Sequence, residues 1–276
     1  MILNPSNQEF DIIILAGQSN AESSGVGDSD TPWVINPNIF MLKGDYDASV
    51  EKTEYGNEFM DIKPSTQYRI EQADERVYNG IKLAVLALPF ALKYFINDLK
   101  PERKILIIHT AVGGTGFANR HWGKGDVLYN RLVSMTEDAL KMNPNNRIVA
   151  MLWHQGEHDA FERADLKPEE RKNLHIKNLN ELLDGLTEKF GEFPFISAGF
   201  TKAWYDKYLE QNRAILDAIK EVCSKRKNAR FIENTFDLKN NDDVCGDGDE
   251  VHFCRQSIDI LGERYYEKFK EIINEK

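Results

Sequence analysis

The sequence has few cysteines, no long hydrophobic segment and no excess of basic residues. Its 276 residues include three cysteines, an odd number without zinc-like spacing, so we expect a reducing compartment and a cytoplasmic protein. No segment approaches the roughly 20 apolar residues that span a bilayer. Lysine and arginine number 35 against 45 aspartates and glutamates, a net charge of −10. This acidic balance argues against nucleic-acid partners, which need a basic surface, and against docking on anionic lipid.

The N-terminal segment lacks the features of a signal peptide. No basic region precedes its short apolar run, so we interpret that run as a buried strand, although a processed secreted chain would look the same. No repeat, low-complexity tract or Pro/Gly/Ser linker divides the chain. Its length therefore suits a single domain over residues 1–276.

Short apolar runs alternate with longer amphipathic stretches. The runs are β-branched and nearly continuous, which is typical of parallel strands buried on both faces. They cover Asp11–Ala16, Ile39–Leu42, Lys104–His109, Arg147–Trp153, Phe193–Ala198 and Arg230–Ile232. Helical spacing of apolar residues predicts helices over Val127–Met142, Pro168–Phe190, Tyr205–Ser224 and Gln256–Ile273. This order predicts a three-layer α/β/α fold around a parallel sheet.

Polar, glycine-containing segments follow three of these runs. They are Gly17–Asn20, Gly113–Gly116 and His154–Glu157. Because function sits at the carboxyl ends of the strands in open α/β sheets, the three segments predict a site at one edge of the sheet. The long polar segment Gly44–Gly80 fits neither a strand nor a helix, so we expect an insertion or a rim loop there.

Ser19 follows a strand and a glycine and is expected to open a helix. A serine at that position exposes its hydroxyl as a nucleophile, and its N–H points toward the group that the hydroxyl attacks. A helix N-cap is the simpler interpretation, because serine is a favoured cap residue. The α/β-hydrolase motif G-x-S-x-G is absent, since position 21 is alanine.

His252 lies three residues after Asp249 near the C-terminus. On a helical turn this spacing brings the carboxylate to one imidazole nitrogen and leaves the other free for proton transfer. An exposed loop histidine in an acidic stretch is the alternative. Asp243 and Asp247 are rival partners.

The glycines of the second polar segment allow two interpretations. Gly113, Gly114 and Gly116 suit backbone N–H donors for an oxyanion or a phosphate. A tight turn after a strand explains them equally well. The dinucleotide pattern G-x-G-x-x-G is incomplete, because Asn119 stands at its last position.

His154 and His158 match the H-x-x-E-H pattern of inverted zinc peptidases. The pattern follows a strand directly and contains Gly156, so the two imidazoles are not expected on one helix face, and we disfavour a metal. The cysteines are expected to be buried apolar side chains. In an oxidising setting Cys245 and Cys254 are candidates for a bridge beside the histidine.

Together the polar blocks resemble one family. The residues LAGQSN at 15–20, GGTG at 113–116, WHQGE at 153–157 and D-x-x-H at 249–252 are similar to the sialate O-acetylesterase branch of the SGNH hydrolases. That branch includes the acetyl xylan esterases of carbohydrate esterase family 6. The blocks occur in the family's order over nearly the whole chain. The resemblance implies a flavodoxin-like three-layer α/β/α fold with a central, mostly parallel five-stranded sheet, and a metal-free serine esterase without a cofactor.

The resemblance also implies roles for the reacting residues. Ser19 is the nucleophile, His252 the base and Asp249 the residue that orients it. Two departures from the family pattern alter the substrate side. Residues 21–24 precede Gly25 where the family returns sooner to glycine, and Glu250 follows the catalytic aspartate where glycine is common.

The oxyanion hole implied by the family consists of the Ser19 amide, a glycine amide at Gly113 or Gly114, and the Gln155 side chain. Residues expected to support the site or contact the substrate are Gln18, Asn20, Glu157, Arg120 and Trp122.

The expected function is therefore hydrolysis of O-acetyl groups from a carbohydrate through an acetyl-enzyme. The expected partner is a small-molecule or oligosaccharide acetyl ester, with O-acetylated sialic acid or a similar acetylated sugar foremost. Three alternatives remain. They are acetyl xylan esterase activity on plant polysaccharide fragments, a zinc metallohydrolase using His154 and His158, and a catalytically silent carbohydrate-binding module.

Overall fold

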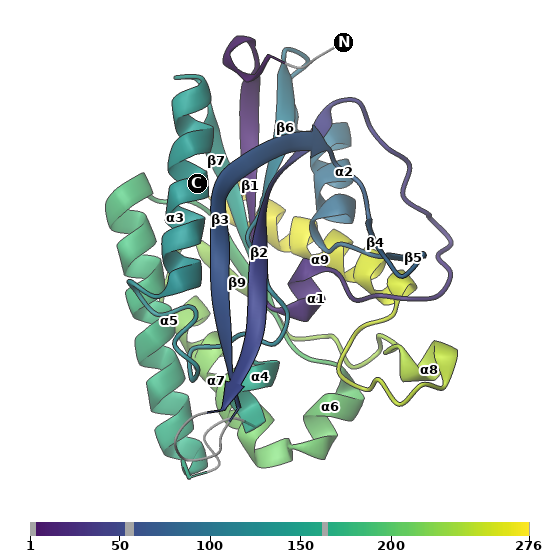
Figure 1. Ribbon diagram of the computed structural model, residues 1–276, viewed down its shortest axis with the longest axis vertical. Helices are drawn as coiled ribbons and strands as arrows, with labels where there is room; N and C mark the ends of the chain where they lie inside the picture. The colour runs from purple at the N-terminus through teal and green to yellow at the C-terminus, as the bar shows by residue number, and fades with distance from the viewer. Residues whose placement is uncertain (1–3, 53–57, 162–164, 276) are drawn as a thin grey trace.

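The computed structural model describes residues 4–52, 58–161 and 165–275 (Figure 1). A seven-stranded sheet forms the centre of this part of the chain, in the order β3-β2-β6-β1-β7-β8-β9. The strands are β1 (Glu9–Gly17), β2 (Ile39–Lys52), β3 (Glu58–Gln72), β6 (Arg103–His109), β7 (Arg147–His154), β8 (Phe195–Ala198) and β9 (Ala229–Ile232). Neighbouring strands are parallel, except that β3 runs antiparallel to β2.

Helices cover both faces of the sheet (Figure 1). Alternate residues of β1 point to opposite faces, so Ile12 and Ile14 join one apolar core while Ile13 and Leu15 join the other. The first core includes side chains of α3 (Val127–Met142), α5 (Pro168–Phe190) and α7 (Leu209–Ser224). The second includes α2 (Ala87–Asn97) and α9 (Arg255–Asn274). The predicted three-layer α/β/α fold is confirmed, and β1 lies at its centre.

Short elements complete the described chain. They are η1 (Pro5–Asn7), α1 (Ser19–Glu22), α4 (Glu157–Phe161), α6 (Lys202–Lys207), α8 (Asp242–Cys245) and the hairpin of β4 (Arg76–Tyr78) and β5 (Ile81–Leu83). The helix expected over Tyr205–Ser224 is divided at Tyr208, whose φ of −127° and ψ of 52° are not helical. No helix in the described ranges is both long enough and apolar enough to cross a membrane.

Two features of the sheet differ from the sequence-based expectation. The sheet has seven strands, whereas the family resemblance implied five. All six apolar runs form strands, and β3 is the seventh. The additional strand lies in the segment 44–80, which is not an irregular loop. There β2 continues to Lys52 and returns as β3, forming a long antiparallel hairpin. Side chains on one face of the hairpin, among them Tyr46, Met60 and Ile62, pack against the first core, whereas the other face carries mostly charged and polar residues. The sequence of the hairpin is therefore mostly polar.

Candidate active site

Ser19 lies just beyond the carboxyl end of β1, the central strand of the sheet. Gly17 has a φ of 124°, and a β-carbon there would lie 2.1 Å from the carbonyl oxygen of His154, so glycine is required at this close approach. The Gln18 amide donates to the same carbonyl at 2.8 Å. This turn fixes β1 against β7 and starts α1 at Ser19.

Ser19, His252 and Asp249 form one hydrogen-bonded chain. Ser19 Oγ lies 2.8 Å from His252 Nε2, and His252 Nδ1 lies 2.8 Å from Asp249 Oδ2. The N-cap interpretation of Ser19 is wrong, because residue 18 is the N-cap of α1 and the Ser19 hydroxyl meets an imidazole instead of a backbone N–H. A hydroxyl hydrogen-bonded to an imidazole that a carboxylate orients is an arrangement able to perform nucleophilic catalysis.

Asp249 reaches His252 through a bend rather than the helical turn that we expected. Its Oδ1 accepts the His252 backbone amide at 3.3 Å, and its Oδ2 accepts the side-chain amide of Asn241 at 2.9 Å. Burial opposes ionisation of Asp249, but the hydrogen bonds from His252 and Asn241 outweigh it and hold its pKa below the usual value. The carboxylate beside the imidazole is therefore ionised at neutral pH.

The neighbouring acidic residues face other partners. Asp243 accepts the backbone amide of Asn240 at 2.8 Å, and Asp247 accepts that of Asp249 at 3.0 Å. Glu250 pairs with Lys207 at 2.6 Å. In the described structure the histidine is thus oriented by Asp249 and by neither rival.

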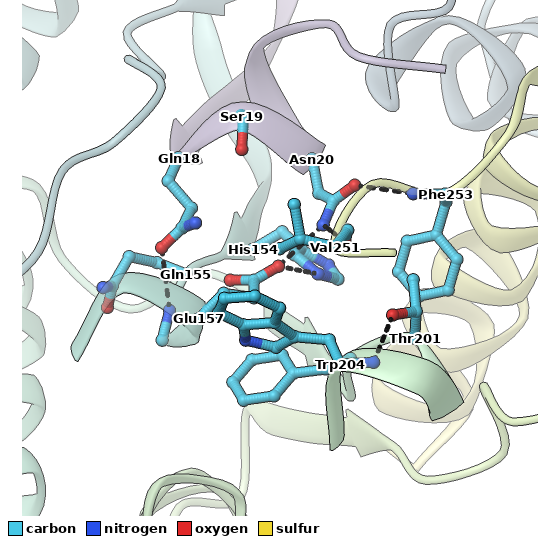
Figure 2. Close-up of polar contacts among 12 residues, drawn as sticks. Gln18, Ser19, Asn20, His154, Gln155, Glu157, Thr201, Trp204, Val251 and Phe253 are labelled. Carbon is cyan, nitrogen blue, oxygen red and sulfur yellow. Dashed lines mark hydrogen bonds and ion pairs between the residues drawn. The ribbon is translucent and has the colours of Figure 1, made fainter. Parts of the chain in front are cut away.

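Asn20 connects the serine segment to the histidine loop (Figure 2). Its amide nitrogen donates to Glu157 at 2.7 Å and to the Val251 carbonyl at 3.1 Å, while its oxygen accepts the Phe253 amide at 3.0 Å. These bonds hold the backbone on both sides of residue 252. Asn20 is fully buried, so it supports the site and does not face a substrate.

Glu157 and Gln18 are also buried supports. Glu157 lies 3.1 Å from His154 Nε2. Burial disfavours its charge, but the charge of His154 and hydrogen bonds from His154 and Asn20 prevail and lower its pKa. The Gln18 side-chain oxygen accepts the backbone amide of His158 at 3.1 Å and joins α1 to α4.

The available oxyanion donors are fewer than the family pattern implies. Among the described residues, the backbone amides of Ser19 and Gly114 have no hydrogen-bond acceptor. The Gly113 amide instead donates to Glu22 at 2.8 Å. The Gln155 amide nitrogen donates to Asp159 at 2.9 Å and more weakly to a backbone carbonyl. Of the two glycines expected as alternatives, Gly114 therefore has the available amide. The expectation that Gln155 is a free donor is wrong, because its amide nitrogen is occupied.

Trp122 and Arg120, the other residues expected to support the site or contact the substrate, have different environments. Trp122 is fully buried, its Nε1 donates to Thr115 at 2.9 Å, and its ring packs edge-on against Trp153 at 5.1 Å. It is a core residue, so the expectation that it contacts the substrate is wrong. Arg120 is exposed and has a φ of 56°.

The zinc and disulfide alternatives find no support in the geometry. His154 ends β7 and contacts Tyr265 and Glu157, whereas His158 lies in α4 and contacts Asn119 at 2.7 Å. Within the described ranges, no group of three His, Cys, Asp or Glu side chains is arranged to hold a metal. Cys245 is exposed, Cys254 is buried, and both are free thiols.

Glu22 is a residue of the site that the sequence interpretation did not identify. Its Oε2 accepts the Gly113 amide, and its Oε1 accepts Tyr46 Oη and Arg76 Nη1, each at 2.8 Å. Gly113 lies against Ser19, because a β-carbon on it would be 3.5 Å from that of Ser19. The departure from the family pattern at residues 21–24 was the available signal, since it places a carboxylate one turn after the serine.

The chain is similar to several known proteins. Residues 9–271 match the model of a carbohydrate esterase family described as sialic acid-specific acetylesterase. A probable 9-O-acetyl-N-acetylneuraminic acid deacetylase of Escherichia coli (strain K12) is 30% identical over 185 residues, which are 54% of this chain and 53% of that protein. A probable carbohydrate esterase of Arabidopsis thaliana is 28% identical over 180 residues, 58% of each protein. The chain thus spans about half the length of the curated relatives it matches.

The fold is also found in a solved structure. The crystal structure of NanS superposes with a TM-score of 0.70 at 21% identity and covers 100% of both chains. The two proteins share the same α/β architecture.

Proposed function

The chain belongs to the sialic acid-specific acetylesterase family of carbohydrate esterases, and on that premise we propose that it hydrolyses O-acetyl esters of sugars. The foremost candidate substrate is O-acetylated sialic acid, which the family description and the name of the Escherichia coli relative both support. The observation that carries the proposal is the chain of two 2.8 Å contacts from Ser19 through His252 to Asp249.

In the proposed reaction, Ser19 Oγ attacks the acetyl carbonyl carbon while His252 Nε2 accepts the hydroxyl proton. The tetrahedral intermediate then collapses. The sugar oxygen leaves with the proton from His252, and the acetyl group stays on Ser19. Water, deprotonated by the same imidazole, releases acetate and restores the serine. Asp249 fixes the imidazole tautomer and stabilises the imidazolium formed in each step.

Two backbone amides serve as oxyanion donors in this proposal. The Ser19 and Gly114 N–H groups have no acceptor in the described structure. They lie on segments that Gly113 brings against Ser19. Backbone donors that are already oriented stabilise the charge that develops on the carbonyl oxygen without reorganising during the reaction.

Acetate release from a panel of esters tests the proposal. The panel contains O-acetylated sialic acids, acetylated xylan fragments and a chromogenic acetate, each assayed with and without a chelator. We expect the highest kcat/KM for an acetylated sialic acid, and no effect of the chelator. A preference for the xylan fragments would favour the acetyl xylan esterase alternative. Chelator-sensitive release would favour a metallohydrolase, and binding without release would favour a carbohydrate-binding module.

A further inference from the structure

Two adjoining cavities extend from the Gly113 loop toward the β2–β3 hairpin. One, of about 330 Å³, is lined by Gly113 and Tyr78 among others. The second, of about 420 Å³, is lined by Arg131 and residues of β2. Glu22 and Arg76 line both cavities, so the two spaces meet at that ion pair. A substrate whose acetyl group lies at the serine has this cleft available for the rest of its sugar.

Arg76 presents part of its guanidinium to the cleft. Its Nη1 donates to Glu22 at 2.8 Å, and its guanidinium lies 5.8 Å from the centre of the Tyr78 ring. The side chain is 44% exposed, and Nε and Nη2 have no hydrogen-bond acceptor within the described residues. Glu22 therefore fixes the guanidinium by one nitrogen and leaves its other edge available. Two parallel N–H groups on such an edge match the two oxygens of a carboxylate.

The negative charge of Glu22 is already shared. Its carboxylate accepts the Gly113 amide and the Tyr46 hydroxyl in addition to Arg76. Three donors on one carboxylate reduce the charge that it presents to the cleft. Glu22 therefore repels a second anion beside Arg76 less strongly than a carboxylate paired with Arg76 alone would.

Arg131 is a buried cation without a carboxylate partner in the described structure. It is 4% exposed, its Nη2 donates to the Gly44 carbonyl, and its Nε and Nη1 have no partner. The Tyr46 ring lies 5.3 Å from the guanidinium. By contrast, Lys43 and Arg69, which line the same cavity, each pair with a carboxylate. A buried charge without a counter-ion is costly, and an anion in the adjoining space would offset that cost.

We propose that Arg76 binds, and Arg131 attracts, a carboxylate on the sugar, so that the enzyme selects acetyl esters of acidic sugars over neutral ones. The inference rests on the proposed function and assigns its sugar specificity to two residues. Arg76 contacts the carboxylate directly. Arg131 supplies positive potential from behind the Tyr46 ring.

The test compares one acetylated sugar in two forms. The probes are 9-O-acetyl-N-acetylneuraminic acid and the same compound with its carboxylate converted to the primary amide. For the wild-type enzyme we expect kcat/KM for the acid to exceed that for the amide by about 10- to 100-fold, mostly through KM, because hydrogen bonds to a charged group are lost in the amide. Arg76→Gln should reduce this preference to less than about threefold.

Arg264→Gln is the matched control, because Arg264 also pairs with a single carboxylate, Asp237, at 2.6 Å. It should keep the wild-type preference. Equal kcat/KM for acid and amide in the wild-type enzyme would overturn this inference and leave the proposed function intact, and that comparison needs no variant to fold. An undiminished preference in folded Arg76→Gln would also overturn it. Acetate release from xylan fragments but from neither probe would overturn this inference and the assignment of sialic acid as the substrate. Acetate release from none of these esters would overturn the proposed function as well.

Discussion

Charged groups meet at both ends of β1, and the two clusters are built differently. At the amino end, Asp11 is fully buried and accepts hydrogen bonds from Arg103 at 2.7 Å, Arg147 at 2.6 Å and Tyr94 at 2.7 Å. At the carboxyl end, the carboxylate of Asp249 contacts an imidazole, which in turn contacts the Ser19 hydroxyl.

The two clusters differ in solvent exposure and in whether their hydrogen bonds are all made within the protein. Both oxygens of Asp11 are bonded and sealed from solvent, so that cluster has no place for another reactant. The side chains of His252 and Asp249 are 26% and 27% exposed, and their chain of contacts ends at a hydroxyl beside the cleft. The pKa of each carboxyl is lowered, so a perturbed pKa alone does not distinguish a structural cluster from a reactive one. Disrupting the carboxyl-end cluster should remove activity, whereas disrupting the amino-end cluster should reduce stability.

The largest effect is expected from Ser19→Ala. Removing the nucleophile should lower kcat by about 10⁴-fold or more. The free energy of unfolding should change by less than about 1 kcal/mol, because the hydroxyl is not part of a buried core. Acetate release and chemical denaturation measure the two quantities. A variant that retains more than about a tenth of wild-type kcat would mean that another group is the nucleophile.

Asp249→Asn should have the next largest effect. The amide no longer selects the reactive imidazole tautomer or stabilises the imidazolium, so kcat should fall by about 10²- to 10⁴-fold. KM should change little, since the side chain does not line the substrate cleft. Steady-state kinetics at pH 8 give both values. Wild-type kcat in this variant would remove Asp249 from the mechanism.

Asp11→Asn should show the opposite behaviour. It removes the fully buried carboxylate from Arg103, which is 7% exposed and keeps only the partly exposed Glu9 as a carboxylate partner. Breaking a buried pair in this way costs about 3 kcal/mol of unfolding free energy. At temperatures where the variant is folded, kcat should stay within about twofold of wild type, because the cluster lies at the far end of β1. A large fall in kcat with unchanged stability would contradict the distinction between the two clusters.

The stability difference between wild type and Asp11→Asn should also depend on pH. Burial opposes ionisation of Asp11, but hydrogen bonds from Arg147 and Tyr94 and the charges of Arg103 and Arg147 hold its pKa below the ordinary value. A lowered folded-state pKa contributes stability above the unfolded-state pKa of about 4, and that stability is lost as the pH falls through the folded-state pKa. The difference should be largest near pH 7 and should narrow below about pH 4. Denaturation curves between pH 7 and pH 3 measure it, and a constant difference would indicate that the charge of Asp11 is not what stabilises the cluster.

The smallest effects are expected from the acidic neighbours of the histidine. Asp243→Asn, Asp247→Asn and Glu250→Gln should each change kcat by less than about fivefold, because these carboxylates contact backbone amides or an exposed lysine. The same assay at pH 8 compares them with Asp249→Asn. A severe loss in Asp247→Asn beside a mild one in Asp249→Asn would require a different catalytic pair.

Much of the fold could be predicted because its strands are buried on both faces. The six continuous apolar runs could be assigned as strands without knowing which strands they pair with. Strand β3 was missed because only one of its faces packs against the core, so its sequence contains no continuous apolar run. Its signal was the alternation of Met60 and Ile62 with charged residues, resumed at Tyr68 and Ile70, and the polar residues 63–67 interrupted it.

The reacting residues were easier to predict than their surroundings. The motif that follows β1 identified Ser19. The D-x-x-H spacing before the last helix identified His252 and Asp249, although a bend and not a helical turn makes the contact. The occupied Gly113 amide could not be predicted, because its acceptor Glu22 lies 91 positions away. Contacts of this kind depend on how the segments pack, which local sequence does not report.

The most direct test of the central claim is covalent labelling with a serine-directed fluorophosphonate, followed by intact mass measurement and peptide mapping. We predict one adduct per chain, on the peptide that contains Ser19. The adduct should be absent from Ser19→Ala and should form more slowly in Asp249→Asn, because the imidazole that activates the hydroxyl is no longer oriented. An unmodified wild-type chain, or an adduct on another residue, would contradict the assignment of Ser19 as the nucleophile.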